Sequence, residues 1–282
     1  MTTKDTYFDY DIHYRDDRGR VLVANSLTSF ESDDHRDDVV LGGSFAGRPT
    51  GVLPVRQGAR GWIAHEAGPG LDDAGVAGLA VSDRFGVPAA AIGTFTSRIA
   101  SGTGLLAGTV SRVNESAARN GVRVGMTGDD AALHMLDAPR GSFRDVTGLV
   151  DESTVEIEVG ERGGIYSCWS SSRVSGRHPH DVFLLASHGA RTMALYVLEI
   201  APRGVIVSDG GMALDRSGVE GLPILAENGV AAAAVSAATA RIGDPTSTAG
   251  GTISAVNEVA FALGVREGQP ALAAARIMLD GE

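Results

Sequence analysis

The chain has 282 residues, of which 43% are hydrophobic and 21% are charged, and this is the composition of an ordinary globular protein with room for two modest domains. Its formal net charge of −11, the absence of any Lys/Arg cluster and the 5% of aromatic residues argue against a nucleic-acid partner. Cys168 is the one cysteine, so the chain cannot form an internal disulfide or a thiolate metal site. We expect Cys168 to be a buried free thiol.

No segment of the sequence predicts secretion or membrane insertion. The residues from Met1 to Thr6 lack the apolar stretch of a signal peptide. The longest apolar run, Gly229–Ala238, is about half the length that a bilayer requires. We therefore expect a cytoplasmic protein with no membrane partner.

The sequence contains an internal repeat with a constant offset and no gap. At this offset Asp38-Val39-Val40-Leu41 lies over Asp181-Val182-Phe183-Leu184, and Val113-Asn114-Glu115 lies over Val256-Asn257-Glu258. Roughly 40 in 100 aligned positions are identical, which is far above chance for unrelated segments. The repeat indicates a gene duplication.

The predicted fold class is α/β, with two tandem homologous repeats related by a pseudo-twofold axis. Each repeat is expected to be a β-hairpin followed by parallel βα units. The first repeat is assigned to residues 1–140 and the second to 146–282. Residues 139–151 are predicted to form a short polar boundary and not a flexible tether.

The first repeat opens with the predicted hairpin. Apolar side chains alternate at Tyr10, Ile12 and Tyr14, and a turn that contains glycine leads into a second strand at Arg20–Ala24. Short apolar runs then alternate with helical patterns, which is typical of buried parallel strands. These predicted strands are Val39–Gly43, Trp62–Ala64 and Ala89–Ile92.

The first repeat is predicted to continue with a helix that begins near Gly108. Its apolar residues have helical spacing, and Asn120-Gly121 is a good C-terminal stop. These apolar residues are Val110, Val113, Ala117 and Ala118.

The second repeat predicts the same elements in the same order. Its hairpin combines an alternating stretch at Val155, Ile157 and Val159 with a strand at Ile165–Cys168. Its predicted parallel strands are Val182–Ala186, Val205–Val207 and Ala231–Val235.

The ends of the second repeat's parallel strands carry the candidate catalytic residues, because ligands of open parallel sheets collect outside the carboxyl ends of the strands. The three strand ends read Ser187-His188-Gly189-Ala190, Ser208-Asp209-Gly210-Gly211 and Thr239-Ala240-Arg241-Ile242-Gly243-Asp244. His188 and Asp209 can form an acid–base pair in which the carboxylate fixes the imidazole tautomer.

Other residues of these motifs predict substrate binding. Arg241, with Asp244 beside it, can clamp an anionic group, and the backbone amides at Gly189 and Gly210 can stabilise developing negative charge. Ser187 is a possible nucleophile, although consecutive side chains diverge and a direct dyad with His188 is sterically awkward.

The first repeat lacks the histidine and both aspartates of these motifs. It carries Phe45 where the second repeat has His188, and we expect its Ser44, Glu66 and Arg98 to help bind the substrate. We interpret this asymmetry as one complete site in the second repeat and a site in the first repeat that has been lost or recruited to shape the other. The alternative is structural: Arg98 and Arg241 can tie a loop to a helix, and a lone His at a strand end is more often hydrogen-bonded than catalytic.

Structural roles are also predicted elsewhere. Asp72 and Asp215 precede glycine and an apolar run, so we interpret them as helix caps, and we interpret Asn114-Glu115 and Asn257-Glu258 in the same way. The glycines match neither a dinucleotide fingerprint nor a phosphate-binding loop with its lysine, so no nucleotide cofactor is expected.

Metal binding is a weaker possibility. His178-Pro179-His180 is an HxH pair in a polar loop, and His65-Glu66 could join such a site. A pair of this kind is more often solvated, so no metal site is predicted.

The strand-end motifs resemble those of a family of conserved hypothetical bacterial proteins. That family carries Ser-His-Gly-Gly, Asn-Asp-Ala-Gly and Ser-Ala-Arg-Ile-Gly-Asp motifs in both halves, and the second repeat matches them with small changes. The first repeat departs from them at Ser44-Phe45-Ala46-Gly47 and Arg98-Ile99-Ala100-Ser101. The resemblance spans nearly the whole chain and implies where the site lies, but implies no activity.

The sequence favours a cofactor-independent enzyme that acts on a small, anionic metabolite, with His188 as general acid/base, and we expect a homo-oligomer. Hydrolysis of an amide, imide or lactone suits this set of residues. The alternatives are a lyase or isomerase, a non-catalytic small-molecule binding protein, and a metal-dependent hydrolase that uses His65, Glu66, His188 and Asp209.

Overall fold

The computed structural model describes residue 7 and residues 9–281. The chain divides into two compact units. The first holds the residues up to Ala67 with Gly75–Asp151, and the second holds Gly68–Ala74 with the residues from Glu152 onward. Each unit contains one six-stranded sheet with the same sequential strand order. The predicted fold class of two tandem α/β repeats is therefore confirmed, whereas the predicted limits of the repeats stay a prediction.

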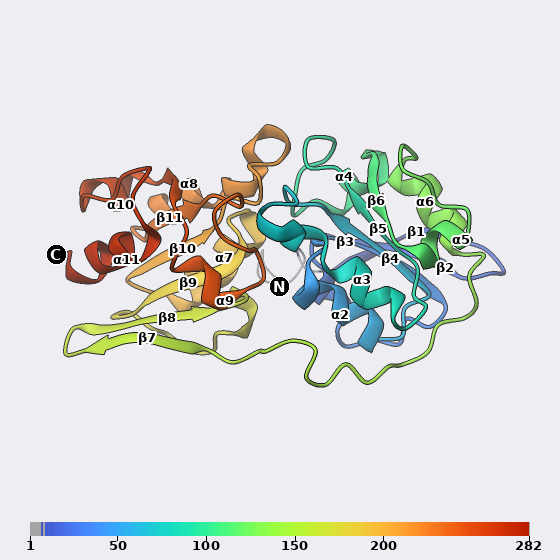
Figure 1. Ribbon diagram of the computed structural model, residues 1–282, viewed down its shortest axis with the longest axis horizontal. Coiled ribbons are helices and arrows are strands. Elements are labelled where there is room, and N and C mark those ends of the chain that lie inside the picture. Colours follow the sequence, from blue (N-terminus) through green and yellow to red (C-terminus); the bar gives the residue numbers. More distant parts are fainter. Residues whose placement is uncertain (1–6, 8, 282) are drawn as a thin grey trace. The chain divides into compact units, whose positions relative to one another are not determined.

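The sheet of the first unit combines four parallel strands with an antiparallel strand at each edge (Figure 1). Its strands are β1 (Tyr10–Arg15), β2 (Arg20–Ala24), β3 (Asp38–Phe45), β4 (Gly61–His65), β5 (Ala89–Ile92) and β6 (Val110–Val113). β2 to β5 run parallel, and β1 and β6 are the antiparallel edges. The predicted hairpin and the three predicted parallel strands are present, and β2 extends the parallel set.

Helices cover both faces of this sheet, and its central strands are therefore buried on both sides. The helices and helical turns of this unit are η1 (Leu27–Phe30), α2 (Arg48–Arg56), α3 (Gly78–Asp83), α4 (Gly102–Ala107), α5 (Glu115–Arg119) and α6 (Gly128–Met135). Another helical turn, η2 (Leu71–Val76), begins in the segment that belongs to the second unit. Every residue of β3 and β4 is buried. Val40 and Trp62 pack with α2 and α3 on one face, and Val39 and Ile63 pack with α4 and α6 on the other.

The second unit repeats this arrangement (Figure 1). Its strands are β7 (Val155–Gly160), β8 (Gly163–Cys168), β9 (Val182–His188), β10 (Gly204–Ser208), β11 (Ala231–Val235) and β12 (Ile253–Val256), with β8 to β11 parallel. Its helices and helical turns are η3 (Ser171–Arg173), α7 (Arg191–Ile200), η4 (Leu214–Val219), α8 (Gly221–Glu227), α9 (Pro245–Thr248), α10 (Glu258–Ala262) and α11 (Ala271–Asp280).

The predicted helix from Gly108 is wrong. Val110–Val113 form the edge strand β6, which pairs antiparallel with β5, and the helix α5 starts only at Glu115. The apolar residues with helical spacing belong to two elements, since Asn114 caps α5 between them. A four-residue edge strand is too short for its alternation to outweigh the helical pattern.

The predicted caps Asn114 and Asn257 are N-caps in the structure, whereas the predicted caps Asp72 and Asp215 are not. Asn114 and Asn257 are the N-caps of α5 and α10, which confirms their structural role. Asp72 and Asp215 lie inside η2 and η4 with left-handed φ angles of 56° and 55°, so the prediction that they are caps is wrong. Aspartate tolerates this conformation better than most residues do.

The segment after α6 lies against the first unit and does not behave as a tether. The Gly141 N–H donates to the Arg36 carbonyl at 2.8 Å, and Arg140 binds both oxygens of Asp37 at 2.7 and 2.9 Å. Leu149 and its neighbours Val146 and Val150 are partly buried against the core of the first unit. Among the described residues, no helix is long and apolar enough to cross a bilayer.

Candidate functional site

The β9 strand ends at His188, directly beside the end of β10. His188 and Ser208 are register partners on these two neighbouring strands, so Asp209 follows at the same edge of the sheet. His188 is buried, with 5% of its surface exposed, and its Nδ1 accepts the Ala190 N–H at 3.3 Å. Because Nδ1 is an acceptor, the neutral imidazole carries its proton on Nε2.

The Asp209 carboxylate is buried and accepts three hydrogen bonds. Its Oδ1 accepts from the N–H groups of Gly211 and Ala237, both at 2.9 Å, and its Oδ2 accepts from the Ser254 hydroxyl at 2.9 Å. None of these three donors is an imidazole. Asp209 therefore fixes the loop that follows its own strand and links it to β11 and β12.

The backbone amides predicted to stabilise negative charge have partners in the structure. The Gly189 N–H donates to the Ser208 carbonyl at 2.9 Å, and the Gly210 N–H donates to Ser208 Oγ at 3.3 Å. Ser187 is the penultimate residue of β9 and is 9% exposed. A ligand that used these amides would have to replace the Ser208 contacts.

Arg241 already holds a carboxylate within the second unit. Its Nε donates to Asp72 Oδ2 at 2.7 Å, its Nη2 lies 2.6 Å from the same oxygen, and its Nη1 lies 3.7 Å from Asp244 Oδ2. Asp244 is also the N-cap of α9, where its Oδ1 accepts from the Thr246 N–H and hydroxyl. The structure therefore brings Arg241 and Asp244 together and adds Asp72 to them, and the role of Arg241 and Asp244 in substrate binding stays a prediction.

The predicted binding residues of the first unit have local partners. Ser44 is buried, and its Oγ accepts the Leu27 N–H at 2.9 Å and lies 3.2 Å from Ser26 Oγ. Glu66 is 7% exposed, and its N–H continues the sheet to Ile92. Arg98 is half-buried in the loop after β5.

A buried imidazole ends β4 in the first unit, as His188 ends β9 in the second. His65 Nδ1 accepts the Ala67 N–H at 2.9 Å, and its Nε2 donates to the Ser97 carbonyl at 3.1 Å. Burial lowers the pKa of His65 to about 4, against hydrogen bonds that raise it. His65 is therefore neutral at physiological pH and has a structural role.

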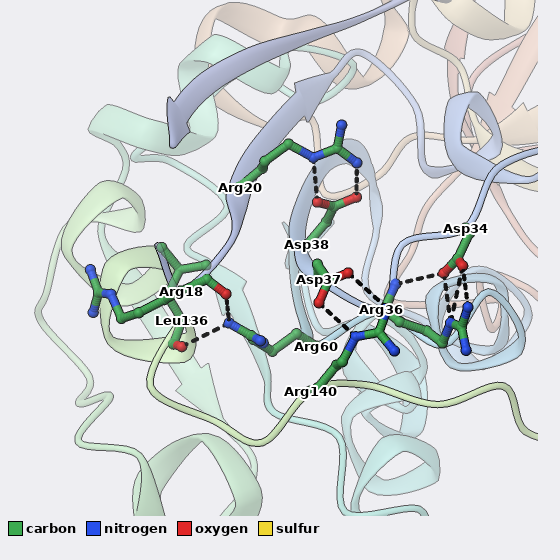
Figure 2. A network of polar contacts seen from close by, with 9 residues as sticks. All are labelled: Arg18, Arg20, Asp34, Arg36, Asp37, Asp38, Arg60, Leu136 and Arg140. Atoms are coloured by element: carbon green, nitrogen blue, oxygen red, sulfur yellow. Dashed lines mark hydrogen bonds and ion pairs between the residues drawn. The ribbon is translucent and has the colours of Figure 1, made fainter. Parts of the chain in front are cut away.

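An ionic cluster at the opposite, amino-terminal edge of the first sheet was missed by sequence reasoning (Figure 2). Asp38 is fully buried, and both its oxygens bind Arg20 at 2.7 Å, while Oδ2 also lies 2.9 Å from His35 Nδ1. The second unit keeps the His–Asp pair as His178 and Asp181, at 3.0 Å. The signal that could have found it is the His-x-x-Asp spacing, which recurs at the offset of the repeat.

The weaker candidates have ordinary structural explanations. His178 contacts Asp181 and the Ser175 carbonyl, and no group of three or more potential metal ligands occurs among the described residues. Cys168 is buried, as predicted, and burial raises the pKa of its thiol to about 12, which makes it a poor nucleophile.

Two hollows of the second unit lie away from the predicted residues. The first, of about 450 Å³, is lined by residues of η4, α8, β12 and the start of α10. The second, of about 620 Å³, lies at the β7–β8 turn and includes Arg162, His180 and Arg203. Neither lining includes His188, Asp209 or Arg241.

No protein-family model, no curated protein and no solved structure matches this chain.

Proposed function

We propose that the chain is a cofactor-independent enzyme that acts on a small, anionic metabolite at the carboxyl edge of the second sheet. The reaction is proposed to be hydrolysis of an amide, imide or lactone. A lyase or isomerase would use the same residues.

The observation that carries this proposal is the backbone after Asp209. Gly210, Gly211, Met212 and Ala213 all have positive φ angles between 55° and 66°, and the run continues at Asp215 and Arg216. Each non-glycine residue in this region costs on the order of 1–3 kcal/mol, and such strain is concentrated at active sites and ligand-binding loops. The three hydrogen bonds of Asp209 and the packing around it hold the loop in this form.

His188 is the proposed proton donor. Its Nδ1 accepts a backbone N–H, so the proton that it can give lies on Nε2. Hydrolysis adds water across the C–N or C–O bond: the oxygen of water bonds to the carbonyl carbon, and His188 gives its Nε2 proton to the leaving nitrogen or oxygen. The attacking water returns a proton to His188, so the imidazole is neutral again at the end of the step. Arg241 is proposed to hold an anionic group of the substrate.

A second candidate is a non-catalytic protein that binds the same kind of metabolite. It is favoured by Asp209, whose three donors position a loop and do not orient His188. In this reading the strained loop shapes a binding site and no proton moves.

The two candidates are distinguished by a hydrolysis assay on the full chain. Succinimide, glutarimide and γ-butyrolactone are supplied as probes, and acid release is followed in a pH-stat. We expect turnover that falls at least 100-fold in His188→Gln, which is the range of general acid–base catalysis. His65→Gln is the matched control, because it removes the other buried strand-end imidazole with the same Nδ1 contact.

The control decides what a loss of activity means. If His65→Gln retains turnover and both variants melt at similar temperatures, the loss belongs to the chemistry at His188. If no probe turns over but succinate raises the melting temperature of the wild type, the binding protein is the better description. Equal loss in both variants would leave His188 as a structural residue.

A further inference from the structure

The second unit has a hollow of about 450 Å³ between η4, α8 and β12. Both repeats place a helix after the η turn, an antiparallel edge strand and a short asparagine-capped helix at this position. The constant offset of the repeat therefore pairs each lining residue of the hollow with a residue of the first repeat. The first unit serves as an internal reference for what the second has lost.

The hollow exists where the second repeat carries two alanines. Ala226 stands where the first repeat has Asp83, and Ala255 stands where it has Arg112. In the first unit the Asp83 carboxylate occupies the corresponding place, since it accepts the N–H groups of Glu115 and Ser116 and the Ser116 hydroxyl at 2.9–3.0 Å. The second repeat has only methyl groups at these two positions, and both alanines line the hollow.

The floor of the hollow is apolar. Val219, Leu222 and Ala255 are each less than 9% exposed and lie beside Pro223 and Ala226. A volume of about 450 Å³ lies within the range of about 300–1,000 Å³ that small-molecule sites occupy. The hollow can therefore take an aliphatic group of several carbons.

The rim of the hollow is acidic. Its lining carries four carboxylates against one guanidinium: Asp215, Glu220, Glu227 and Glu258 against Arg216. Glu227 and Glu258 are solvent-exposed. Glu227 replaces Arg84 of the first repeat, and Ala262 replaces Arg119, whose Nη1 lies 3.7 Å from Glu115, the counterpart of Glu258. The second repeat has thus lost three arginines of the first, at Arg84, Arg112 and Arg119, and has gained one, Arg216, where the first repeat has Asp73. The number of carboxylates is the same, since Glu220 and Glu227 stand against the lost Asp73 and Asp83.

We propose that this hollow binds a small organic cation with an aliphatic body, such as a primary alkylammonium compound. The apolar floor takes the hydrocarbon, and Glu227 and Glu258 at the rim bind the ammonium group. Charge complementarity selects the cation, because a carboxylate ligand of the same shape would meet four like charges. This site is separate from the strand ends and does not depend on the proposed enzymatic function.

The test uses three probes with the same cyclohexyl body: cyclohexylmethylamine, cyclohexanecarboxylate and cyclohexylmethanol. Binding to the full chain is measured by calorimetry and by saturation-transfer NMR at pH 7.5, where the amine is a cation. We expect saturable binding of the amine and at least tenfold weaker binding of the acid and the alcohol. Equal binding of the three probes, or no binding of the amine, would overturn the proposal.

Variants place the binding in the hollow. Ala255→Arg restores the side chain of the first repeat, and we expect it to weaken amine binding at least tenfold. Val159→Arg adds the same charge on the edge strand β7, at a position that is 58% exposed and outside the hollow, and should leave binding unchanged.

A second variant keeps the test decisive if Ala255→Arg fails to fold. The double variant Glu227→Gln, Glu258→Gln preserves the shape of the exposed rim and removes two charges. We expect it also to lose at least tenfold in affinity for the amine. Unchanged affinity in this variant would show that the cation binds elsewhere, and would refute the assignment.

Discussion

Asn114 and Asn257, which occupy equivalent positions of the two repeats, make the same four hydrogen bonds in the two units. The Oδ1 atom of each accepts a backbone N–H near the start of the neighbouring strand, at Ala89 or Ala232, and the N–H of the third residue of its own helix. The Nδ2 atom of each donates to two carbonyls around the preceding helix. Both side chains are buried and use their full hydrogen-bonding capacity.

Replacing either asparagine by alanine should therefore destabilise its unit strongly. Asn257→Ala removes a helix cap and leaves buried backbone groups without partners, and together these losses cost about 3 kcal/mol. Asn114→Ala should cost the same amount within the error of the measurement. Urea unfolding monitored by circular dichroism gives both values.

The control for this pair is Asn228→Ala. Asn228 is exposed and donates one hydrogen bond, to the Ile224 carbonyl at 2.8 Å, so its loss should cost less than about 1 kcal/mol. If Asn257→Ala proved no more costly than Asn228→Ala, the buried network would contribute little to stability.

The asparagines show which features the sequence reveals. The repeat, the hairpins and the central strands are predictable, because identical residues at one offset and long apolar runs leave few alternatives. The edge strand β6 is not, because its four residues share an apolar pattern with the helix after Asn114. A strand of this length is defined by its pairing with β5, and pairing cannot be read from the strand itself.

The sequence predicts where the candidate site lies, but it does not predict which groups its residues contact. Parallel strands bring His188 and Asp209 to one edge, as their places at strand ends predict. Asp209 accepts hydrogen bonds from its own loop, from Ala237 and from Ser254. These three contacts depend on the path that the backbone takes after the strand. The partner of Arg241 was missed for a similar reason, because Asp72 lies 169 residues away in sequence.

Asp38→Asn should be among the most damaging single substitutions in the first unit. Burial raises the pKa of Asp38, but hydrogen bonds from His35 and Arg20 outweigh this effect and leave the pKa below its ordinary value. Removing the charge leaves Arg20, whose side chain is 32% exposed, without its bidentate partner and leaves His35 without a charged acceptor, and together these losses cost about 3 kcal/mol.

The matched variant is Asp181→Asn in the second unit. Asp181 is partly exposed, binds His178, and accepts the Gly164 N–H, which an asparagine oxygen can also accept. We expect a loss of about 1 kcal/mol, as is typical of exposed pairs. Equal losses in the two variants, compared by urea unfolding at pH 7, would argue against a special role for Arg20.

His65 should make stability depend on pH between about 4 and 6.5. Burial lowers its pKa to about 4 in the folded protein, below the value near 6.5 of an unfolded chain. The unfolded state therefore binds a proton in this window and the folded state does not, so stability is complete above pH 6.5 and falls as the pH is lowered. At pH 5 this single group should cost about 2 kcal/mol relative to pH 7.

The measurement compares wild type with His65→Gln at pH 7 and pH 5. The variant loses some stability at both pH values, but its loss between them should be about 2 kcal/mol smaller than that of the wild type. The difference isolates His65 from the other histidines. If the free energy of unfolding changed equally with pH in the two proteins, the pKa of His65 would be the same in the folded and unfolded states, and the prediction would be wrong.

Asp72 should compete with any anionic ligand for Arg241. The Arg241 guanidinium donates a hydrogen bond from Nε to Asp72 Oδ2 and forms an ion pair with it. The side chains of Arg241 and Asp72 are 47% and 58% exposed, so a ligand from solvent can reach the pair. In Asp72→Asn the competing charge is gone, while an exposed ion pair of this kind contributes little to stability. We expect succinate, used as a dicarboxylate probe in calorimetry, to bind at least fivefold more tightly to Asp72→Asn than to the wild type.

Two further variants show whether Asp72 acts only through the guanidinium. Arg241→Gln should abolish succinate binding, and the double variant Asp72→Asn, Arg241→Gln should resemble Arg241→Gln, because a competitor has no effect once the group it competes for is gone. If Asp72→Asn weakened succinate binding instead, the carboxylate would be holding Arg241 in its binding position. The ion pair would then belong to the site as a support and not as a competitor.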